Sequence, residues 1–272
     1  MPELFQYNDA ALYAHHSLDS HPQDFPMHAH EMYEVYYFIS GDCSYLVEGC
    51  EYALRPHDLL ITRSAEAHKM ILHSDAPYER IVIHFHPSLL EQIAPDGLLL
   101  HPFTARPLGM QNLYRSADGA LPRWSTCFEI LSRPAELAAQ KRLHIIQCLL
   151  GILDSIAFSG AVSDTAAPQG ANLACDLMNY VNEHLFEELS LRSISETFFL
   201  SPSQLNRLFR RASGSSCWSY IQIKRLLAAR ELLRQGQPAT VVCETCGFHD
   251  YSTFYRAYRA HFGAAPSKKQ PH

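Results

Sequence analysis

The sequence lacks long hydrophobic runs. No stretch of 18 apolar residues occurs among its 272 residues, so we expect no membrane-spanning helix and no membrane partner. Residues 1–9 contain neither a basic nor an apolar segment of the kind found in secretory signals. Eight scattered cysteines are too few for a disulfide scaffold. Together these absences predict a reduced, cytoplasmic protein.

Glycine and proline are also sparse, at 12 and 16 residues, which excludes collagen-like and low-complexity architectures. Hydrophobic residues make up 47% of the chain and charged residues 18%, so the chain can bury a core and is not largely disordered. Its length predicts two domains.

Charge is distributed unevenly along the chain. The net charge is −6, but residues 173–272 contain 12 basic and 8 acidic side chains, a balance of +4. The remaining residues contain 10 basic and 20 acidic side chains, a balance of −10. Such asymmetry predicts a basic module with its own partner, which is often nucleic acid.

The first 86 residues show the pattern of short strands. Runs rich in Val, Ile, Tyr and Phe are separated by turn residues, with no helical periodicity between them. This pattern predicts an antiparallel barrel or sandwich, such as a jelly roll. The expected strands are residues 34–39, 44–47, 52–54, 59–62 and 81–85.

Helical periodicity begins after Pro87. Residues 88–93 look helical, residues 96–134 give no clear pattern, and residues 136–158 form a long amphipathic helix. This helix can pack on the barrel as part of a helical hairpin, or on its copy in a homodimer. Its apolar positions are Leu137, Leu143, Ile146, Leu149, Leu150 and Leu153.

Residues 159–172 are small, polar and interrupted by Pro and Gly, which is typical of a linker. We therefore expect an α+β protein with two domains. Residues 1–158 would form the barrel domain and residues 173–272 an all-α domain.

The all-α region contains a weak internal repeat at an offset of 49 residues. Each copy has a short helix, a turn, a capping residue and a second helix. The capping residues are Ser201, which Pro202 follows at the first helical position, and Asp250. Two helices joined by a tight turn predict a helix-turn-helix unit. The expected helices are residues 194–198 and 202–211, then 241–246 and 251–261.

Residues 218–235 lie between the two copies and read as one buried helix. A helix of this length spans about 27 Å, and successive major grooves on one face of B-DNA lie about 34 Å apart. The spacer can therefore place two second helices in neighbouring grooves of one duplex.

The second helix of each copy presents polar residues on its outward face. Arginine can read guanine and asparagine can read adenine, whereas a plain solvated face is the alternative interpretation. Arginines at equivalent positions of a repeat favour contact with DNA. The outward residues are Ser203, Asn206, Arg207 and Arg210, then Tyr251, Ser252, Tyr255, Arg256 and Arg259.

About a hundred residues resemble the AraC/XylS family of bacterial transcriptional regulators, with both units in register. The resemblance depends on residues 189–191, 200–209, 214–216, 229–233, 246–259 and 262–263, with Tyr220, Arg225, Leu226 and Pro266. Two positions depart from the family pattern. Phe199 replaces a glycine or small polar residue in the first turn, and Ser195 replaces an alanine.

The resemblance implies a seven-helix domain that binds specific DNA sequences, and a small-molecule effector, with sugars as one class. It also implies transcriptional activation and contact with RNA polymerase, without enzyme activity or a cofactor. The base-reading residues it implies are Ser203, Asn206 and Arg207, then Ser252, Tyr255 and Arg256.

Residues 28–41 are similar to the first cupin motif, with His28, His30 and Glu34 in the expected spacing. On a continuous strand these three side chains would share one face, because side chains alternate. His68 fits the late histidine of the second motif, which is degraded because His57 replaces its glycine.

These four residues can bind a metal, bind a polar effector or serve packing alone, and a metal-dependent cupin enzyme with a DNA-binding tail is the rival function. We interpret His84 and His86, expected at the domain edge, and the pair Cys243 and Cys246 as structural.

Overall fold

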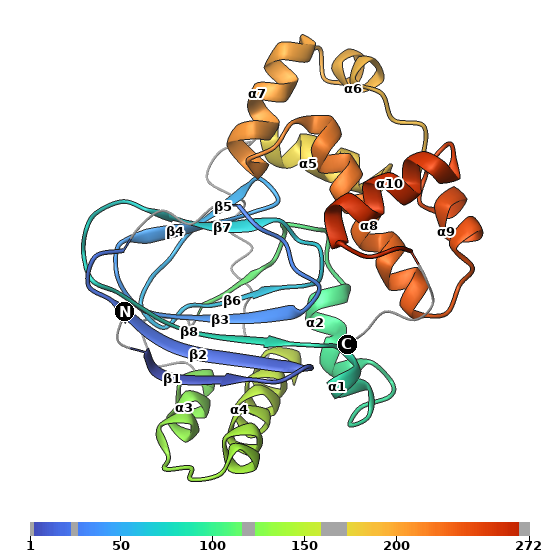
Figure 1. Ribbon diagram of the computed structural model, residues 1–272. Coiled ribbons are helices and arrows are strands. Elements are labelled where there is room, and N and C mark those ends of the chain that lie inside the picture. Colours follow the sequence, from blue (N-terminus) through green and yellow to red (C-terminus); the bar gives the residue numbers. More distant parts are fainter. Residues whose placement is uncertain (1–2, 23–26, 116–122, 159–172, 267–272) are drawn as a thin grey trace. The chain divides into compact units, whose positions relative to one another are not determined.

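The computed structural model describes residues 3–22, 27–115, 123–158 and 173–266 (Figure 1). They form two compact units, Met1–Ala171 and Asn172–His272, here called the β-rich unit and the helical unit. The predicted linker, residues 159–172, lies outside the described residues, so the exact domain boundaries stay a prediction.

The β-rich unit contains two antiparallel sheets, which confirms the predicted fold class. The larger sheet has the strand order β1-β2-β8-β3-β6-β9, and the smaller has the order β5-β4-β7. The strands are β1 (Glu3–Asn8), β2 (Leu12–Asp19), β3 (Tyr33–Ser40), β4 (Cys43–Val47), β5 (Cys50–Ala53), β6 (Leu59–Thr62), β7 (His68–Leu72), β8 (Tyr78–Phe85) and β9 (Leu113–Tyr114).

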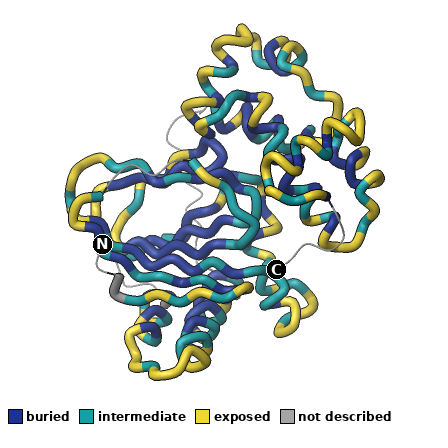
Figure 2. The backbone as a smooth tube through the Cα atoms, in the orientation of Figure 1, coloured by how far each residue is buried: buried dark blue, intermediate teal, exposed yellow. Residues whose placement is uncertain are grey.

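Alternation of side chains gives the larger sheet two different faces. Ile81, Ile83 and Phe85 of β8 point to one face and pack into a hydrophobic core with helix α4 (Ala138–Phe158). Residues between them point to the opposite face, toward the smaller sheet. Both faces of the central strands are therefore buried, as the dark strands in Figure 2 show.

Short helices accompany α4 in the region that gave no sequence pattern. They are α1 (Ser88–Glu91), η1 (Leu98–Leu100), α2 (His101–Thr104), α3 (Arg123–Phe128) and η3 (Glu129–Ser132). Trp124 and Phe128 of α3 are buried in the same core as α4, which confirms the helical hairpin on the barrel.

Helix α4 uses most of its apolar positions against the sheet. Leu149 and Leu153 are fully buried in the core, whereas Leu137 is 63% exposed and Leu143 54% exposed. Packing on the barrel thus accounts for most of the apolar stripe, and homodimer formation through residues 136–158 stays a prediction.

The helical unit contains six helices within residues 173–266, one fewer than the resemblance implies. They are α5 (Leu173–Glu183), α6 (Leu191–Thr197), α7 (Pro202–Ser213), α8 (Cys217–Arg234), α9 (Ala239–Thr245) and α10 (Tyr251–Phe262). Helices α6–α7 and α9–α10 are the two expected helix-turn-helix pairs, and α8 is the spacer helix. Among the described residues, no helix combines the length and apolar character needed to cross a bilayer.

The ends of the second helices confirm the repeat. The side chain of Ser201 accepts a hydrogen bond from the Gln204 amide, and that of Asp250 accepts one from the Thr253 amide. Both helices end at a left-handed glycine, Gly214 with φ 70° and Gly263 with φ 72°.

The two turns differ in one respect. Each contains a left-handed residue, Phe199 with φ 53° in the first and Gly247 with φ 73° in the second. Phe199 is 95% exposed, so nothing in its packing offsets the cost of this backbone conformation. The second turn also has one more residue before its capping residue, since His249 has no equivalent in the first.

Replacing Phe199 by glycine should stabilise the first helix-turn-helix pair by about 1 kcal/mol, because glycine adopts positive φ without strain. Hydrogen exchange of the α7 amides in the full-length chain measures this change. The matched control is Gly247→Ala in the second turn, which should destabilise, because an added Cβ would lie 2.9 Å from Arg225 Cζ. Unchanged or faster exchange in the glycine variant would contradict the assignment of strain.

Candidate functional site

A cavity of about 140 Å³ lies within the β-rich unit. It is large enough for a small organic molecule. Its lining combines imidazoles, phenols and a few apolar groups, namely His15, His28, Glu34, Tyr36, Tyr45, Met70, Tyr78, Arg80, Val82 and His84.

Strand alternation places these groups together. Tyr78, Arg80, Val82 and His84 occupy every second position of β8 and line the cavity, while Ile81 and Ile83 between them join the core with α4. Cross-strand register puts His84 opposite Glu34 of β3. The cavity wall is thus the second face of the same strands that build the core.

Glu34 is the centre of the cavity's polar groups. Its Oε1 accepts a hydrogen bond from the Tyr45 hydroxyl at 2.9 Å. Its Oε2 lies 2.6 Å from His84 Nε2, 3.1 Å from His30 Nε2 and 3.5 Å from His68 Nε2. Three imidazoles and one phenol therefore surround a single buried carboxylate.

Burial alone would raise the pKa of Glu34, but the neighbouring imidazoles outweigh burial and hold its pKa well below the usual value. Burial alone would lower the pKa of His68, but the Glu34 carboxylate outweighs it and raises the pKa. At His15, burial together with Arg80 and His84 lowers the pKa to about 4, so this imidazole is neutral at pH 7.

The predicted continuous strand through residues 28–34 is wrong. Strand β3 begins at Tyr33, and His28 instead forms an isolated bridge with His68 of β7. The bend at residues 31–32 nevertheless returns His30 to Glu34. Pairing with β7, rather than parity along one strand, brings the predicted residues together.

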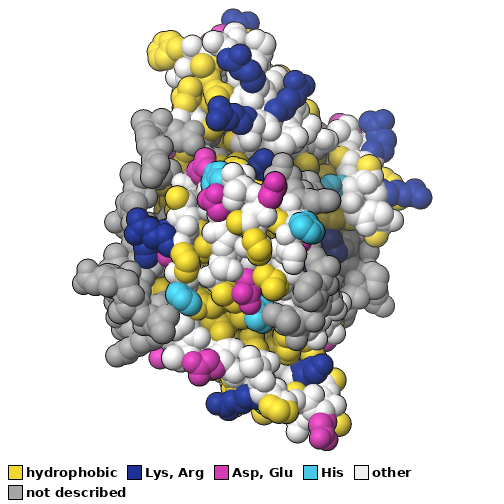
Figure 3. Space-filling model, turned by 90° about the vertical axis from the view of Figure 1, so that its left-hand side faces the viewer, with side chains coloured by type: hydrophobic (Ala, Val, Ile, Leu, Met, Phe, Trp, Pro, Cys, Tyr) yellow, Lys and Arg dark blue, Asp and Glu magenta, His cyan; other side chains and the backbone are white. Residues whose placement is uncertain are grey.

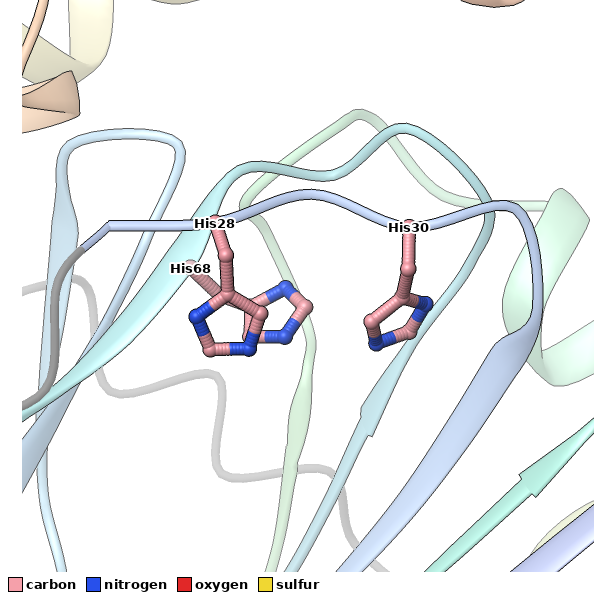
Figure 4. Close-up of side chains that lie close together, drawn as sticks. All are labelled: His28, His30 and His68. Atoms are coloured by element: carbon pink, nitrogen blue, oxygen red, sulfur yellow. The ribbon is translucent and has the colours of Figure 1, made fainter. Parts of the chain in front are cut away.

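His28, His30 and His68 place ring nitrogens within 4.8 Å of one another (Figure 4). His30, Glu34 and His84 form a second group of possible ligands at the same spacing. The Nδ1 atoms of His30 and His68 lie 2.7 Å from the carbonyl oxygens of Met32 and Glu66. A ring N–H directed at a carbonyl leaves Nε2 available as a ligand, an arrangement typical of metal-binding histidines. These residues therefore fit a transition-metal ion.

His84 is a site residue that the sequence interpretation missed. We expected it at the domain edge, but β8 lies between β2 and β3 in the middle of the larger sheet. The alternation of residues 78–84 was a usable signal, because polar groups occupy three of its four cavity positions. His86 is separate and contacts the Ser88 hydroxyl at 2.7 Å.

The degraded second motif has a structural role. His57, which replaces glycine, adopts φ 73°, and its Nδ1 lies 2.7 Å from the Tyr37 hydroxyl. Asp58 is buried and accepts hydrogen bonds from Arg115 at 2.6–3.2 Å. Neither side chain lines the cavity.

Helix α7 exposes Ser203, Arg207 and Arg210, as expected from the sequence. Lys and Arg side chains gather at the top of Figure 3, over helices α6 and α7. Asn206 is different, because it is half-buried and its Oδ1 accepts a hydrogen bond from the Cys217 amide at 3.1 Å. Asn206 thus joins α7 to the start of α8, and its role in reading bases stays a prediction.

Helix α10 exposes Ser252, Arg256 and Arg259, with Tyr255 half-buried. Arg256 Nε donates to the Ser252 carbonyl at 3.3 Å. On the other face of α10, Phe254 and Tyr258 are buried in the core with α8 and α9. The arginine face of the second pair is therefore presented as the sequence predicted.

Two further groups of the helical unit are buried. Cys243 and Cys246 are free thiols inside the core, which confirms their structural interpretation. Lys224 of the spacer helix is also buried, with Nζ 5.4 Å from the centre of the Tyr220 ring. Lys224 therefore packs within the helical unit and does not belong to its exposed basic face.

Residues 13–167, more than half of the chain, match the family model of the AraC-like ligand-binding domain. The chain belongs to the AraC family. Residues 194–270 match a helix-turn-helix domain, which agrees with the two pairs in the helical unit. This AraC-family chain thus has the ligand-binding and DNA-binding domains of a transcriptional regulator.

Two relatives are transcriptional regulators. The probable transcriptional regulator LumQ of Photobacterium leiognathi is 34% identical over 93 residues, which span 34% of this chain and 38% of LumQ. The transcriptional activator RhaS of Salmonella schwarzengrund is 25% identical over 89% of this chain and 86% of RhaS. The solved structure of ToxT from Vibrio cholerae covers 95% of this chain and 97% of ToxT at 13% identity, with a TM-score of 0.37.

The stability of the metal-free β-rich unit should depend on pH through Glu34 and His68. The raised pKa of His68 adds stability below its usual 6.5, and this contribution is lost as pH rises through the folded value. The lowered pKa of Glu34 adds stability above its usual 4.5, and this contribution is lost as pH falls through the folded value.

Chemical denaturation of the full chain with a chelator present should therefore show stability declining above pH 6.5. Glu34→Gln should flatten this decline, because His68 loses the carboxylate that stabilises its charge. Glu79→Gln, which removes a half-exposed contact to His16, is the matched control and should leave the decline unchanged. Equal slopes for both variants would disprove the role of Glu34.

Proposed function

We propose that this chain regulates transcription by binding a promoter or operator through both helix-turn-helix pairs, under the control of a small molecule bound in the β-rich unit. The cavity supports the effector role, because polar groups converge on it from β3, β7 and β8. Effector binding would shift the population between DNA-competent and DNA-incompetent states, and no catalysis is required.

One observation carries the DNA-binding part of the proposal. Arg207 in α7 and Arg256 in α10 are both exposed and both lie six residues after a helix-capping residue. The α8 spacer of 18 residues is about 27 Å long and buried along most of its length. Two similar arginine-bearing helices on one rigid spacer suit neighbouring grooves of a duplex.

Arg207→Ala and Arg256→Ala should each weaken binding to the preferred DNA site by about 1–3 kcal/mol. Each should abolish base preference in a different segment, and the two segments should lie about one helical turn apart. The test selects preferred sites from random DNA with the full-length chain, then measures affinities for single base-pair changes.

Arg234→Ala, an exposed arginine at the end of α8, is the matched control and should retain preference at every base pair. Loss of preference at the same base pair in both test variants would overturn the two-groove arrangement. Failure of the wild-type chain to select any sequence would overturn DNA recognition itself.

A metal-sensing regulator is the second candidate function. It is favoured by the His28, His30 and His68 nitrogens, which lie within 4.8 Å, and by the carbonyl partners of His30 and His68. The neutral imidazoles of these residues would coordinate a bound ion. Because His28 is exposed, a small ligand could reach the ion from solvent.

Titration of chelator-treated full-length protein with Zn²⁺ and Ni²⁺ tests this candidate. His28→Ala should weaken binding at least about tenfold, as expected for loss of a ligand. His16→Ala, which lies outside both groups of ligands and contacts Glu79, is the control and should bind as the wild type does. Equal affinities for the two variants would exclude the site.

Homodimer formation and contact with RNA polymerase extend the proposal. Exposed Leu143 on α4 and exposed Leu137, directly before the helix, are the remaining apolar residues in favour of a dimer. The choice of a sugar or another effector, and of activation as the outcome, rests on the family resemblance alone.

A further inference from the structure

One buried arginine ties together parts of the helical unit that lie far apart in the sequence. Arg225 is in the middle of spacer helix α8 and is 4% exposed. Its Nε donates to the Leu185 carbonyl at 2.8 Å, its Nη2 to the Glu187 carbonyl at 2.8 Å, and its Nη1 to the Gly247 carbonyl at 2.6 Å.

These carbonyls belong to two functional segments. Leu185 and Glu187 lie in the loop that leads into α6, the first helix of the first helix-turn-helix pair. Gly247 lies in the turn that leads into α10, the recognition helix of the second pair. A single guanidinium on the spacer thus holds the entry to one pair and the turn of the other.

The space around Arg225 is shaped for this arrangement. A Cβ added at Gly247 would lie 2.9 Å from Arg225 Cζ and 3.1 Å from the Phe186 carbonyl oxygen. Gly247 therefore serves both the left-handed turn and the close approach of the arginine. The turn cannot shift toward the loop without displacing the guanidinium.

Burying a cation against neutral carbonyls is costly, and an apolar side chain would fill the same space without that cost. The flat guanidinium offers donors in a fixed fork, so it sets the directions of three carbonyls at once. A lysine presents a point charge and cannot reproduce the fork. The geometry therefore indicates that Arg225 serves to orient the two loops that carry these carbonyls, rather than to stabilise the helical unit.

The first recognition helix, α7, is joined to the same spacer by a separate hydrogen bond. The Asn206 side chain of α7 accepts this bond from the Cys217 amide at the start of α8. The two recognition helices are therefore each fixed to α8 by one hydrogen-bonding side chain. Asn206 holds α7 at the beginning of the spacer, and Arg225 holds the turn before α10 near its middle.

We propose that Arg225 is a positioning residue that sets the orientation of α10 for base recognition, an inference that rests on the proposed DNA-binding function. It does not touch DNA and acts through the Gly247 carbonyl. Its replacement should disturb reading by the second pair and leave reading by the first pair intact.

The test uses the full-length chain and a DNA site selected by the wild type. Each single base-pair change is measured with Arg225→Lys, and active protein is counted by stoichiometric titration. Discrimination should fall about tenfold or more in the segment that depends on Arg256, and remain in the segment that depends on Arg207. Adding Arg256→Ala to Arg225→Lys should cost less than about twofold, whereas adding Arg207→Ala should cost its full amount.

A merely structural role gives a different result. Arg225→Lys would then weaken binding to all sequences alike, with discrimination unchanged in both segments, and this outcome would overturn the proposal. If Arg225→Lys does not fold, Gly247→Ala replaces it, since this change keeps the arginine but displaces its guanidinium. The same one-sided loss is expected, and uniform weakening would again refute it. A wild-type chain that selects no DNA site at all overturns the proposed function instead.

Discussion

A carboxylate removed from water must be matched by nearby donors, and this requirement organises the β-rich unit around Glu34. Its oxygens contact Tyr45, His30, His84 and His68, which come from four separate segments of the chain. The same strands bury apolar residues against α4 on their other face. A rigid apolar layer therefore supports a polar cavity, and the cavity is able to vary in chemistry without loss of the core.

In the helical unit, two small helix pairs with little core of their own are held in place by the spacer helix α8. Serine and aspartate caps begin the second helix of each pair, and left-handed glycines end it. The long spacer adds Leu226, Ala229 and Leu233 to the core that it shares with α9 and α10. Hydrogen bonds of the Asn206 and Arg225 side chains add directional contacts to this apolar packing. Hydrophobic contact alone does not specify orientation, whereas hydrogen bonds do.

Local patterns predicted much of this architecture. Capping residues and apolar periodicity located α7, α8 and α10 closely, and runs of β-branched and aromatic residues located five strands. Strands β1, β2 and β7 were not predicted, because polar residues interrupt their apolar pattern. Pairing with neighbouring strands stabilises them in the structure. The short helices between residues 96 and 134 were not predicted either. Their local helix preferences are weak, and tertiary packing determines where they form.

By itself, the sequence determined the two-part organisation, the repeated helix pairs, the exposed arginines and the set of His28, His30, Glu34 and His68 as candidates, because these depend on residue type and short-range spacing. Only the tertiary structure decided that His84 joins Glu34, that Lys224 is buried, and that Asn206 and Arg225 form hydrogen bonds with distant segments. These contacts depend on strand register and helix packing between residues far apart in the chain, where the spacing along the sequence holds no information about distance in space.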